Sequence, residues 1–390
     1  MSRPSLWSLF LSFLKIGSTA FGGFMALISM VQTDIVERKK LLTHSEMVDG
    51  ISLATILPGP VAVNVVAYVG YKLRGGLGAL VSAVGVILPA FILIVALSAV
   101  YFRWGQIPTV NRLFLGFIPA VTAIIVHAAW GMARKAIAGL PEFAIAFVAC
   151  LLLLYKGGFY ITLAIIVSAG LIGWLLFARL SNPSSGNAET KPAQKRDGVE
   201  LFALNAPLAV APFLALDAGL AVKLFLTFSG MSVLLFGGGF VFIPLIEQIV
   251  VQEQAWLTHQ EFIDAIALGQ ITPGPILISA AFIGYKVMGL LGAAIATVAI
   301  FLPPALLMLV SAHFLMRMRE STAVKAVLRG IRPAVIGMIV AAAWSIGITA
   351  VPNWLSAVIF LAALTALLRF RVDVAWIIPT AGVTGLLLYR

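Results

Sequence analysis

Long apolar runs separated by short polar segments form the main pattern of this sequence. A helix needs about 20 apolar residues to cross a bilayer. In the first half, runs of that kind occur at residues 6–30, 76–102, 113–133, 140–155 and 157–178. In the second half they occur at residues 220–246, 290–316, 333–351, 354–369 and 373–389. The pattern predicts an all-α integral membrane protein with about five transmembrane helices in each half.

One polar segment separates the two halves. Residues 181–197 read SNPSSGNAETKPAQKRD, which contains Pro, Gly, Ser and charged residues without apolar periodicity. Such a composition is typical of an exposed, flexible linker. We therefore predict a first repeat at residues 1–180, a linker on the cytoplasmic side at 181–200, and a second repeat at 201–390.

The two halves are similar in sequence. Residues 42–60 read LTHSEMVDGISLATILPGP and residues 257–275 read LTHQEFIDAIALGQITPGP, with 11 of 19 positions identical. The second stretch lies 215 residues after the first, and a one-residue deletion shifts the later matches to a spacing of 214. Agreement of this length does not arise by chance. We infer that one unit was duplicated, so that residues at this spacing are equivalent.

Each half contains an apolar segment that Pro-Gly-Pro interrupts, at residues 58–60 and 273–275. Proline removes a backbone donor and clashes with the preceding turn, so two prolines around a glycine stop a helix. A broken helix at membrane depth is tolerated only where it is buried in protein or lines a wet cavity. Each motif is therefore either the tip of a re-entrant hairpin or the unwound centre of a helix that spans the membrane.

The number of crossings sets the orientation of the second half. If the Pro-Gly-Pro motifs are re-entrant, each half crosses five times, and an odd number inverts the second half relative to the first. With the linker inside, Lys and Arg then number eleven inside against four outside in the first half, and seven against two in the second. In the alternative topology, the helices that contain the Pro-Gly-Pro motifs span the membrane, and residues 201–216 form a further crossing. The excess of Lys and Arg on the inside is then smaller. The two topologies together cover 10–13 crossings.

Composition and charge narrow the classes of function. The chain has 390 residues, of which 61% are hydrophobic and 11% charged. Its 26 Lys and Arg give a net charge of +11 but are scattered between apolar runs, which argues against nucleic-acid binding. Cys150 is the only cysteine, so neither an internal disulfide nor a cysteine metal cluster can form. Metalloprotease, serine hydrolase and Walker signatures are missing, and we expect no enzyme activity, metal or cofactor.

Inverted repeats with paired broken helices are typical of secondary transporters, whose substrate binds at the repeat interface. The helix after each break presents unpaired N–H groups and the positive end of its dipole, which favour an anion. Adjacent glycines in the first apolar run of each half add exposed backbone. Kinks for packing and close helix contact are the structural alternatives. The predicted anion-binding residues are Gly22, Gly23, Pro58, Gly59, Pro60, Asn64, Gly237, Gly238, Gln270, Thr272, Pro273, Gly274, Pro275 and Ser279.

Two pairs of equivalent carboxylates have different predicted roles. Glu46 and Glu261 each follow a threonine by three positions, which is the pattern of a helix capping box. Asp49 and Asp264 lie one turn deeper on the same helical face, where an ionised carboxylate is costly. The two glutamates are predicted caps and the two aspartates candidates for proton coupling, with buried interhelical hydrogen bonds as the alternative.

One lysine lies in the first apolar run of each half. Lys15 and Lys223 are not equivalent, because position 15 corresponds to Gly230. Each of these lysines either extends to the membrane interface or attracts the anion.

Taken together, the motifs resemble the chromate transporter family. The resemblance is carried by F-G-G at residues 21–23 and 236–238, by L-T-x-x-E, by Pro-Gly-Pro, by G-Y-K and by a later L-P, and it covers nearly the whole chain. In that family a domain of this size occurs singly or, as here, twice. One departure is Phe24 after the first glycine pair, where family members often carry proline or a third glycine.

The resemblance implies a protein of the cytoplasmic membrane that exports chromate, driven by the electrochemical gradient, with proton linkage as one form of coupling. Sulfate, which is also a tetrahedral dianion, is the alternative substrate. A passive anion channel, or an intramembrane enzyme that uses Asp49 and Asp264, would also fit these residues. The expected partners are the oxyanion and membrane lipid, and assembly into a homo-oligomer stays open.

Overall fold

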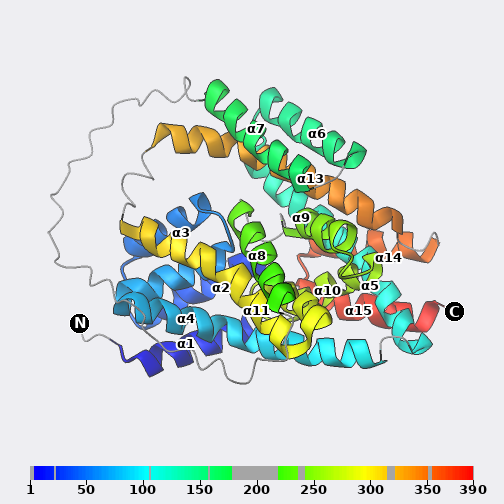
Figure 1. Cartoon of the computed structure of the whole chain (residues 1–390), viewed down its shortest axis with the longest axis horizontal. Helices are drawn as coiled ribbons and strands as arrows, with labels where there is room; N and C mark the ends of the chain where they lie inside the picture. The colour runs from blue at the N-terminus through cyan, green and yellow to red at the C-terminus, as the bar shows by residue number, and fades with distance from the viewer. Residues whose placement is uncertain are drawn as a thin grey trace.

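Helices make up the described part of the chain. The computed structural model describes residues 4–21, 23–104, 107–156, 159–177, 218–235, 242–313, 321–349 and 354–389. Within these ranges no strand is present (Figure 1), and five helices are long and apolar enough to cross a membrane. The predicted linker, the run at 201–216 and three predicted anion-binding residues, Gly22, Gly237 and Gly238, lie outside the described residues.

The helices follow a similar order in both halves. The first half contains α1 (Leu6–Thr19), α2 (Gly23–Gln32), the π-helix η1 (Thr33–Arg38), α3 (His44–Ile56), α4 (Val61–Trp104), α5 (Pro108–Ala136), α6 (Leu140–Tyr155) and α7 (Phe159–Phe177). The second contains α8 (Ala218–Leu234), α9 (Phe242–Glu247), η3 (Gln248–Glu253), α10 (His259–Ile271), η4 (Ile276–Ile278), α11 (Ser279–His313), α13 (Thr322–Thr349), α14 (Trp354–Thr365), η5 (Ala366–Phe370) and α15 (Val374–Leu388). The helices coincide with eight of the ten predicted apolar runs. The two exceptions are the runs at 6–30 and 220–246.

The two runs predicted as single spans, 6–30 and 220–246, are each divided. α1 ends at Thr19 and α8 ends at Leu234, and a second helix begins after each break. Adjacent glycines follow both helix ends, and glycine is among the poorest helix formers. The prediction of one continuous span at each of these positions was therefore wrong.

After the first break the chain folds back on itself. The Lys39 Nζ donates a hydrogen bond to the Ser12 Oγ at 2.5 Å, across 27 positions of sequence. In one continuous helix these two residues would lie about 40 Å apart. α1 and the segment formed by α2 and η1 are therefore two legs of a hairpin, which turns after Thr19.

The 44-residue helix α4 also contains a reversal. Arg74 and Gly75 have non-helical backbone angles, with φ at −143° and 65°. A Cβ atom at Gly70 would lie 2.3 Å from the carbonyl oxygen of Gly78, which would be far away in a straight helix. α11 reverses in the same way at Met288 and Gly289, where Gly284 lies against Gly292.

α3 and the first leg of α4 form a second hairpin, with Pro-Gly-Pro at its tip. Gly50 of α3 faces Tyr68 of α4, where an added Cβ would lie 2.4 Å from the ring. α3 has 13 residues and a length of about 20 Å, less than the bilayer core of about 30 Å. α10 and the start of α11 pair similarly, with Gly269 against Ser279. Each Pro-Gly-Pro motif therefore lies at the turn of a helical hairpin.

Unusual backbone angles recur at equivalent positions of the two halves. A positive φ is rare for residues other than glycine, so each instance marks a specific turn. Three pairs occur at the spacing of the repeat: Lys40 and Ala255 (50° and 48°), Gly59 and Gly274 (102° and 111°), and Gly75 and Gly289 (65° and 62°). The similarity of the halves in sequence therefore extends to their local folding.

Helices of one half pack on helices of the other. α13 lies along α6 and α7, and α5 lies along α14 and α15. The first arrangement is visible at the upper edge of Figure 1. Glycines permit the close approach, with Gly173 against Gly330 in one contact and Gly116 against Gly385 in the other. The halves are interlocked rather than placed side by side.

Candidate functional site

Each Pro-Gly-Pro tip docks on the broken first helix of the other half. The Gly59 N–H donates to the carbonyl oxygen of Leu235 at 2.6 Å, and the Gly274 N–H donates to that of Ala20 at 2.9 Å. Ala20 and Leu235 are equivalent positions, each directly before F-G-G. The two contacts are therefore reciprocal, and each joins the two motifs that sequence reasoning singled out.

Close packing explains why glycine is required at both tips. A Cβ atom at Gly59 would lie 2.2 Å from the Cβ of Pro304, and one at Gly274 would lie 3.3 Å from the Cβ of Ala90. Ala90 and Pro304 are equivalent positions in the long helices α4 and α11. Each tip therefore lies between the first helix and the long helix of the other half.

The docking restricts which backbone donors can reach an anion. The N–H groups of Gly59 and Gly274 already donate to carbonyl oxygens. The remaining donors are the first N–H groups after each break, beginning at Val61 in α4 and at Ile276 in η4, which have no acceptor within their own helix. An anion at the tips would therefore be held by these groups and not by the glycines themselves.

The polar side chains near the tips differ in whether their hydrogen-bonding groups have partners. Ser279 and Thr272 turn back to their own helices and donate to the carbonyl oxygens of Ile276 and Gly269, at 2.7 and 2.9 Å. Asn64, which is fully buried, donates through Nδ2 to the carbonyl oxygen of Pro58 at 3.1 Å.

Two buried polar atoms are unpaired near the tips. Among the described residues, neither Asn64 Oδ1 nor Gln270 Nε2 has a hydrogen-bond partner. Unpaired buried polar groups are rare in folded proteins, because each loses its hydration without compensation. Asn64 and Gln270 are therefore the predicted site residues whose side chains retain free hydrogen-bonding capacity.

The two candidate proton-coupling aspartates have different surroundings. Asp264 is buried, with 1% of its surface exposed, and accepts hydrogen bonds from the Tyr101 Oη at 2.6 Å and the Gln260 Nε2 at 3.0 Å. Asp49 is only half-buried. Tyr101 belongs to α4 of the first half, so the Asp264 contact joins the two halves. Sequence reasoning missed Tyr101, because 163 positions separate it from its partner.

The two predicted capping boxes are confirmed. The Thr43 N–H donates to the Glu46 carboxylate at 3.0 Å, and the Thr258 N–H donates to the Glu261 carboxylate at 2.9 Å. Glu261 also forms an ion pair with Lys286 at 2.7 Å. Both glutamates therefore fix the start of the first leg of their hairpin.

Comparison with known proteins places the chain in a family. The family model described as "Chromate transporter" matches residues 7–174 and again residues 222–386. The chain belongs to the chromate transporter family. This confirms the resemblance seen in the motifs. The family is one of transporters and not of enzymes, and the chain is a multi-pass protein of the cytoplasmic membrane.

Relatives of this transporter cover nearly its whole length. A chromate transport protein of Cupriavidus metallidurans is 29% identical over 99% of this chain and 94% of its own. A chromate transport protein of Pseudomonas aeruginosa is 31% identical, over 100% and 93%. An uncharacterized transporter of Methanocaldococcus jannaschii is 31% identical, over 87% and 84%. No solved structure matches the chain.

Sequence reasoning also missed two buried carboxylates of the transporter. Glu247 lies 3.2 Å from the His259 Nδ1 and accepts a hydrogen bond from the Ser345 Oγ at 3.3 Å. Glu142 of α6 forms an ion pair with Arg329 of α13 at 2.8 Å. The repeat could not have revealed either one, because the positions equivalent to Glu247 and Glu142 hold Gln32 and Ser356.

The Glu142–Arg329 pair gives a test of the contact between halves. Glu142 is buried, whereas the Arg329 side chain is 47% exposed and stacks on Phe177. Arg329→Ala should lower the free energy of unfolding by about 2 kcal/mol, because it leaves a buried carboxylate without its partner. Chemical unfolding in detergent measures this loss. Arg332→Ala on the same helix is the control, and an equal loss in both variants would contradict a specific role for the pair.

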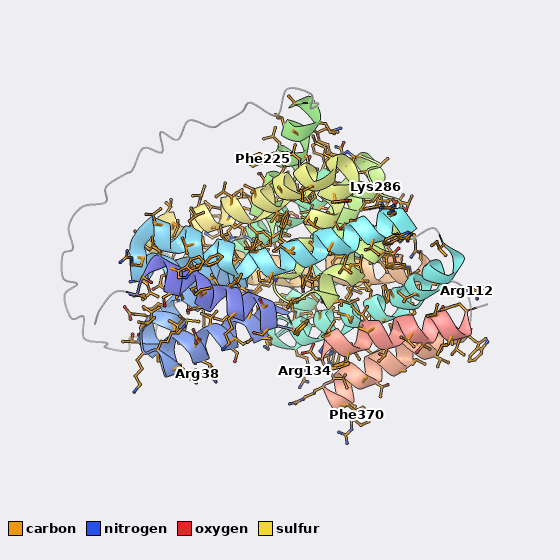
Figure 2. All side chains as sticks on the ribbon, turned by 90° about the horizontal axis from the view of Figure 1, so that it is seen from below. Arg38, Arg112, Arg134, Phe225, Lys286 and Phe370 are labelled. Carbon is orange, nitrogen blue, oxygen red and sulfur yellow. The ribbon has the colours of Figure 1, made fainter. Side chains whose placement is uncertain are left out.

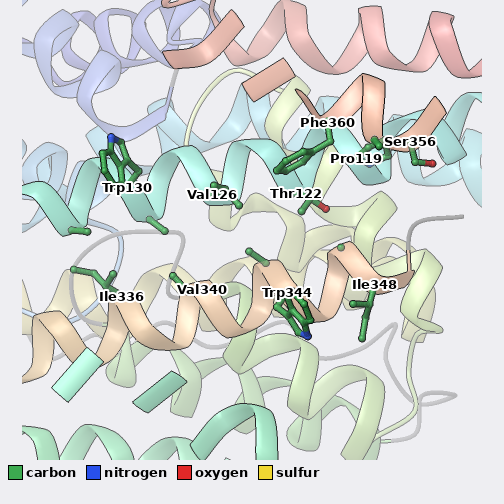
Figure 3. Close-up of a pocket in the computed structure, with 15 residues that line it drawn as sticks. Pro119, Thr122, Val126, Trp130, Ile336, Val340, Trp344, Ile348, Ser356 and Phe360 are labelled. Atoms are coloured by element: carbon green, nitrogen blue, oxygen red, sulfur yellow. The ribbon is translucent and has the colours of Figure 1, made fainter. Parts of the chain in front are cut away.

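A large apolar groove of the transporter lies away from the tips. It has a volume of about 770 Å³ and is bounded by α5, α13 and α14 (Figure 3). The equivalent residues Trp130 and Trp344 both line it, and most of the remaining lining side chains are aliphatic. An apolar surface cannot replace the hydration of an anion. We therefore do not include this groove in the candidate anion site.

Proposed function

We propose that this chain is a secondary transporter that exports chromate across the cytoplasmic membrane, driven by the electrochemical gradient. The observation that carries the proposal is the reciprocal docking of the two Pro-Gly-Pro tips, with Gly59 bonded to Leu235 and Gly274 bonded to Ala20. Paired broken helices at a repeat interface are the arrangement in which transporters bind their substrate. The names of the relatives in Cupriavidus and Pseudomonas support chromate as the substrate.

The anion would bind where the first N–H groups of α4 and η4 are free. These groups carry the positive end of a helix dipole, so they favour a dianion without a fixed positive charge. Gln270 adds an unpaired donor, its Nε2, whereas the unpaired Asn64 Oδ1 is an acceptor, and the Asn64 Nδ2 would have to leave the Pro58 carbonyl to reach an anion. Because helix N–H groups favour any tetrahedral dianion, sulfate competition is part of the test of this site.

An inverted relation between the halves is part of the proposal. α5 packs antiparallel to α13, since Trp130 of α5 lies beside Ile336 of α13 and Thr122 lies beside Trp344 (Figure 3). Gly347, one turn after Trp344, also lies against Thr122. α5 and its counterpart α13 would then cross the membrane in opposite directions. Such a pair can open alternately to the two sides by rocking about a fixed site.

Chromate export and its energy source can be tested in cells. Cells that carry the protein are expected to accumulate several-fold less labelled chromate than cells without it. Collapsing both the proton gradient and the membrane potential with an uncoupler should abolish the difference, because the transporter would then have no driving force. Intracellular label is measured against time, with excess sulfate as a competing anion in a parallel arm.

The controls distinguish a carrier from a channel. A control strain should carry a variant that is inserted in the membrane but inactive, so that expression alone does not alter uptake. Export that persists after the gradients collapse would exclude a gradient-driven transporter. A flux that shows neither saturation nor exchange of external for internal anion would indicate a channel.

A further inference from the structure

A groove that contains charged and hydroxyl side chains lies between the two legs of the first hairpin. Its volume is about 670 Å³, and it is bounded by α1 on one side and by α2 and η1 on the other. Four serines and two threonines contribute to its lining. The charged side chains that line it are Lys15, Asp34, Arg38 and Lys39. Polar walls of this kind at membrane depth are tolerated where they face water and not lipid.

The groove has an excess of positive charge. Lys39 is paired with Asp34 at 2.6 Å and also donates to Ser12. In the described part of the chain, neither Lys15 nor Arg38 has a carboxylate within ion-pair distance. The three cations and one carboxylate leave a net charge of +2 in a cleft with apolar surroundings. Such a cleft concentrates anions, because low-dielectric walls focus the field.

The inner end of the groove reaches a Pro-Gly-Pro tip. Thr19 lines the groove, and the next residue, Ala20, accepts the hydrogen bond from the Gly274 N–H. Lys15 lies one helical turn before Thr19. Arg38 lies at the opposite end of the groove, toward the end of the molecule's long axis that is remote from Arg112 (Figure 2). The groove therefore connects the end of the molecule near Arg38 with the tip of the second half.

The second half has no equivalent of this charge. The positions that correspond to Lys15, Arg38 and Lys39 hold Gly230, Glu253 and Gln254. Because the second half lacks these cations, the charge at these three positions is a feature of the first half alone. It gives the two ends of the protein different affinities for an anion.

Positively charged residues indicate which side of the membrane the groove faces. Arg38, Lys39 and Lys40 form one basic cluster, and Lys72 and Arg74 lie where the second hairpin returns. Basic loops face the cytoplasm in multi-pass proteins. An opening on that side would admit an anion that is to be exported.

We propose that the groove between α1 and η1 is a cytoplasmic vestibule for a small divalent oxyanion, in which Lys15 attracts the anion next to the tip of the second half. This proposal rests on the proposed export function. It assigns Lys15 to the anion and not to the membrane interface. A lysine that only reached for lipid headgroups would not need the hydroxyl-lined cleft in which Lys15 lies.

Uptake of labelled chromate into inside-out vesicles tests the vestibule, because these vesicles expose the cytoplasmic face. Lys15→Gln is expected to raise the half-saturation concentration about tenfold, in line with the anion enrichment in a charged cleft. Lys15→Arg keeps the charge and should stay within about threefold of wild type. The difference between wild type and Lys15→Gln should shrink at high ionic strength, because salt screens the attraction.

Two lysines serve as matched controls. Lys40 lies one residue beyond the groove and does not line it, and Lys223 lies in α8, the counterpart of α1. Lys40→Gln and Lys223→Gln should leave the half-saturation concentration within about twofold of wild type. Thermal unfolding in detergent establishes that all variants are folded. Wild-type values for Lys15→Gln, or an equal defect in Lys15→Arg and the two controls, would overturn the vestibule.

Equilibrium binding of chromate to the purified protein separates this proposal from the proposed function. If wild type binds chromate but does not transport it, the export function fails, and weaker binding by Lys15→Gln still supports the vestibule. If Lys15→Gln binds as well as wild type in that case, the vestibule fails too. A wild-type protein that neither binds nor transports chromate or sulfate would overturn both proposals.

Discussion

Gly59→Ala is expected to lower the free energy of unfolding by about 4 kcal/mol, because it combines backbone strain with an overlap of atoms. Gly59 has a φ of 102°, which residues with a Cβ rarely adopt. The added Cβ would lie 2.2 Å from the Cβ of Pro304. Proline is rigid and cannot move aside as a flexible side chain would. The tip would have to leave its place between the helices of the second half and lose its bond to Leu235.

The control for Gly59→Ala separates the strain from the overlap. Gly75 has a φ of 65° and no atom within 4 Å of its added Cβ. Gly75→Ala should therefore cost only the strain, about 1 kcal/mol. The equivalent variant Gly274→Ala should lie between the two at about 2 kcal/mol, since its Cβ would lie 3.3 Å from that of Ala90.

Denaturant unfolding in detergent micelles measures all three glycine variants under the same conditions. The order of the losses, Gly59 first, then Gly274 and then Gly75, is what the packing requires. Equal losses at Gly59 and Gly75 would mean that only the backbone angle matters. The tip would then not be tightly packed against Pro304.

Features encoded by neighbouring residues could be predicted from the sequence. The breaks at Pro-Gly-Pro and the two capping boxes depend on the residues within one or two turns. The eight apolar helices outside the first run of each half follow from length and hydrophobicity. Because each motif occurs once in each half, the repeat provided a second example that supported its interpretation. These predictions needed no knowledge of which helix packs on which.

Features that depend on distant contacts could not be predicted. The first apolar run has the length of one span, and contacts between distant residues, such as Lys39 with Ser12, reveal that it folds back. The hydrogen bond between Tyr101 and Asp264 joins residues of different halves. The position equivalent to Tyr101 holds Leu315, which has no hydroxyl group, so the duplicated motif conceals a difference between the two halves. Sequence reasoning treated Asp49 and Asp264 alike because their local patterns are alike.

The contact between Ala20 and Gly274 changes the interpretation of the predicted anion site. The sequence analysis places Gly59 and Gly274 among the anion-binding residues, together with the first N–H groups of the helix that follows each of them. The structure uses the glycine N–H of each tip to hold the two halves together. The glycines therefore position the start of the following helix, and the anion would be left to the first N–H groups of that helix.

Asp264→Asn is expected to abolish the part of chromate transport that an imposed pH gradient drives, a loss of at least about tenfold if Asp264 carries the coupled proton. A buried carboxylate is costly to ionise, whereas asparagine has a similar shape and cannot exchange a proton. Exchange of chromate across the vesicle membrane, which needs no net proton movement, should persist in the variant. Uptake by reconstituted vesicles with and without a pH gradient measures the two processes separately.

Three variants define what the result at Asp264 means. Tyr101→Phe removes the hydrogen bond from the other half but leaves the carboxylate, so it should shift the pH at which the gradient is effective without abolishing transport. Asp49→Asn should have the smaller effect, because Asp49 is half-buried.

Glu261→Gln should cost mainly stability, about 1 kcal/mol for a weakened cap. If Asp264→Asn keeps its response to the pH gradient while Glu261→Gln loses it in a folded protein, the glutamate and not the aspartate carries the proton. The contact between Tyr101 and Asp264 would then be a structural hydrogen bond between the halves.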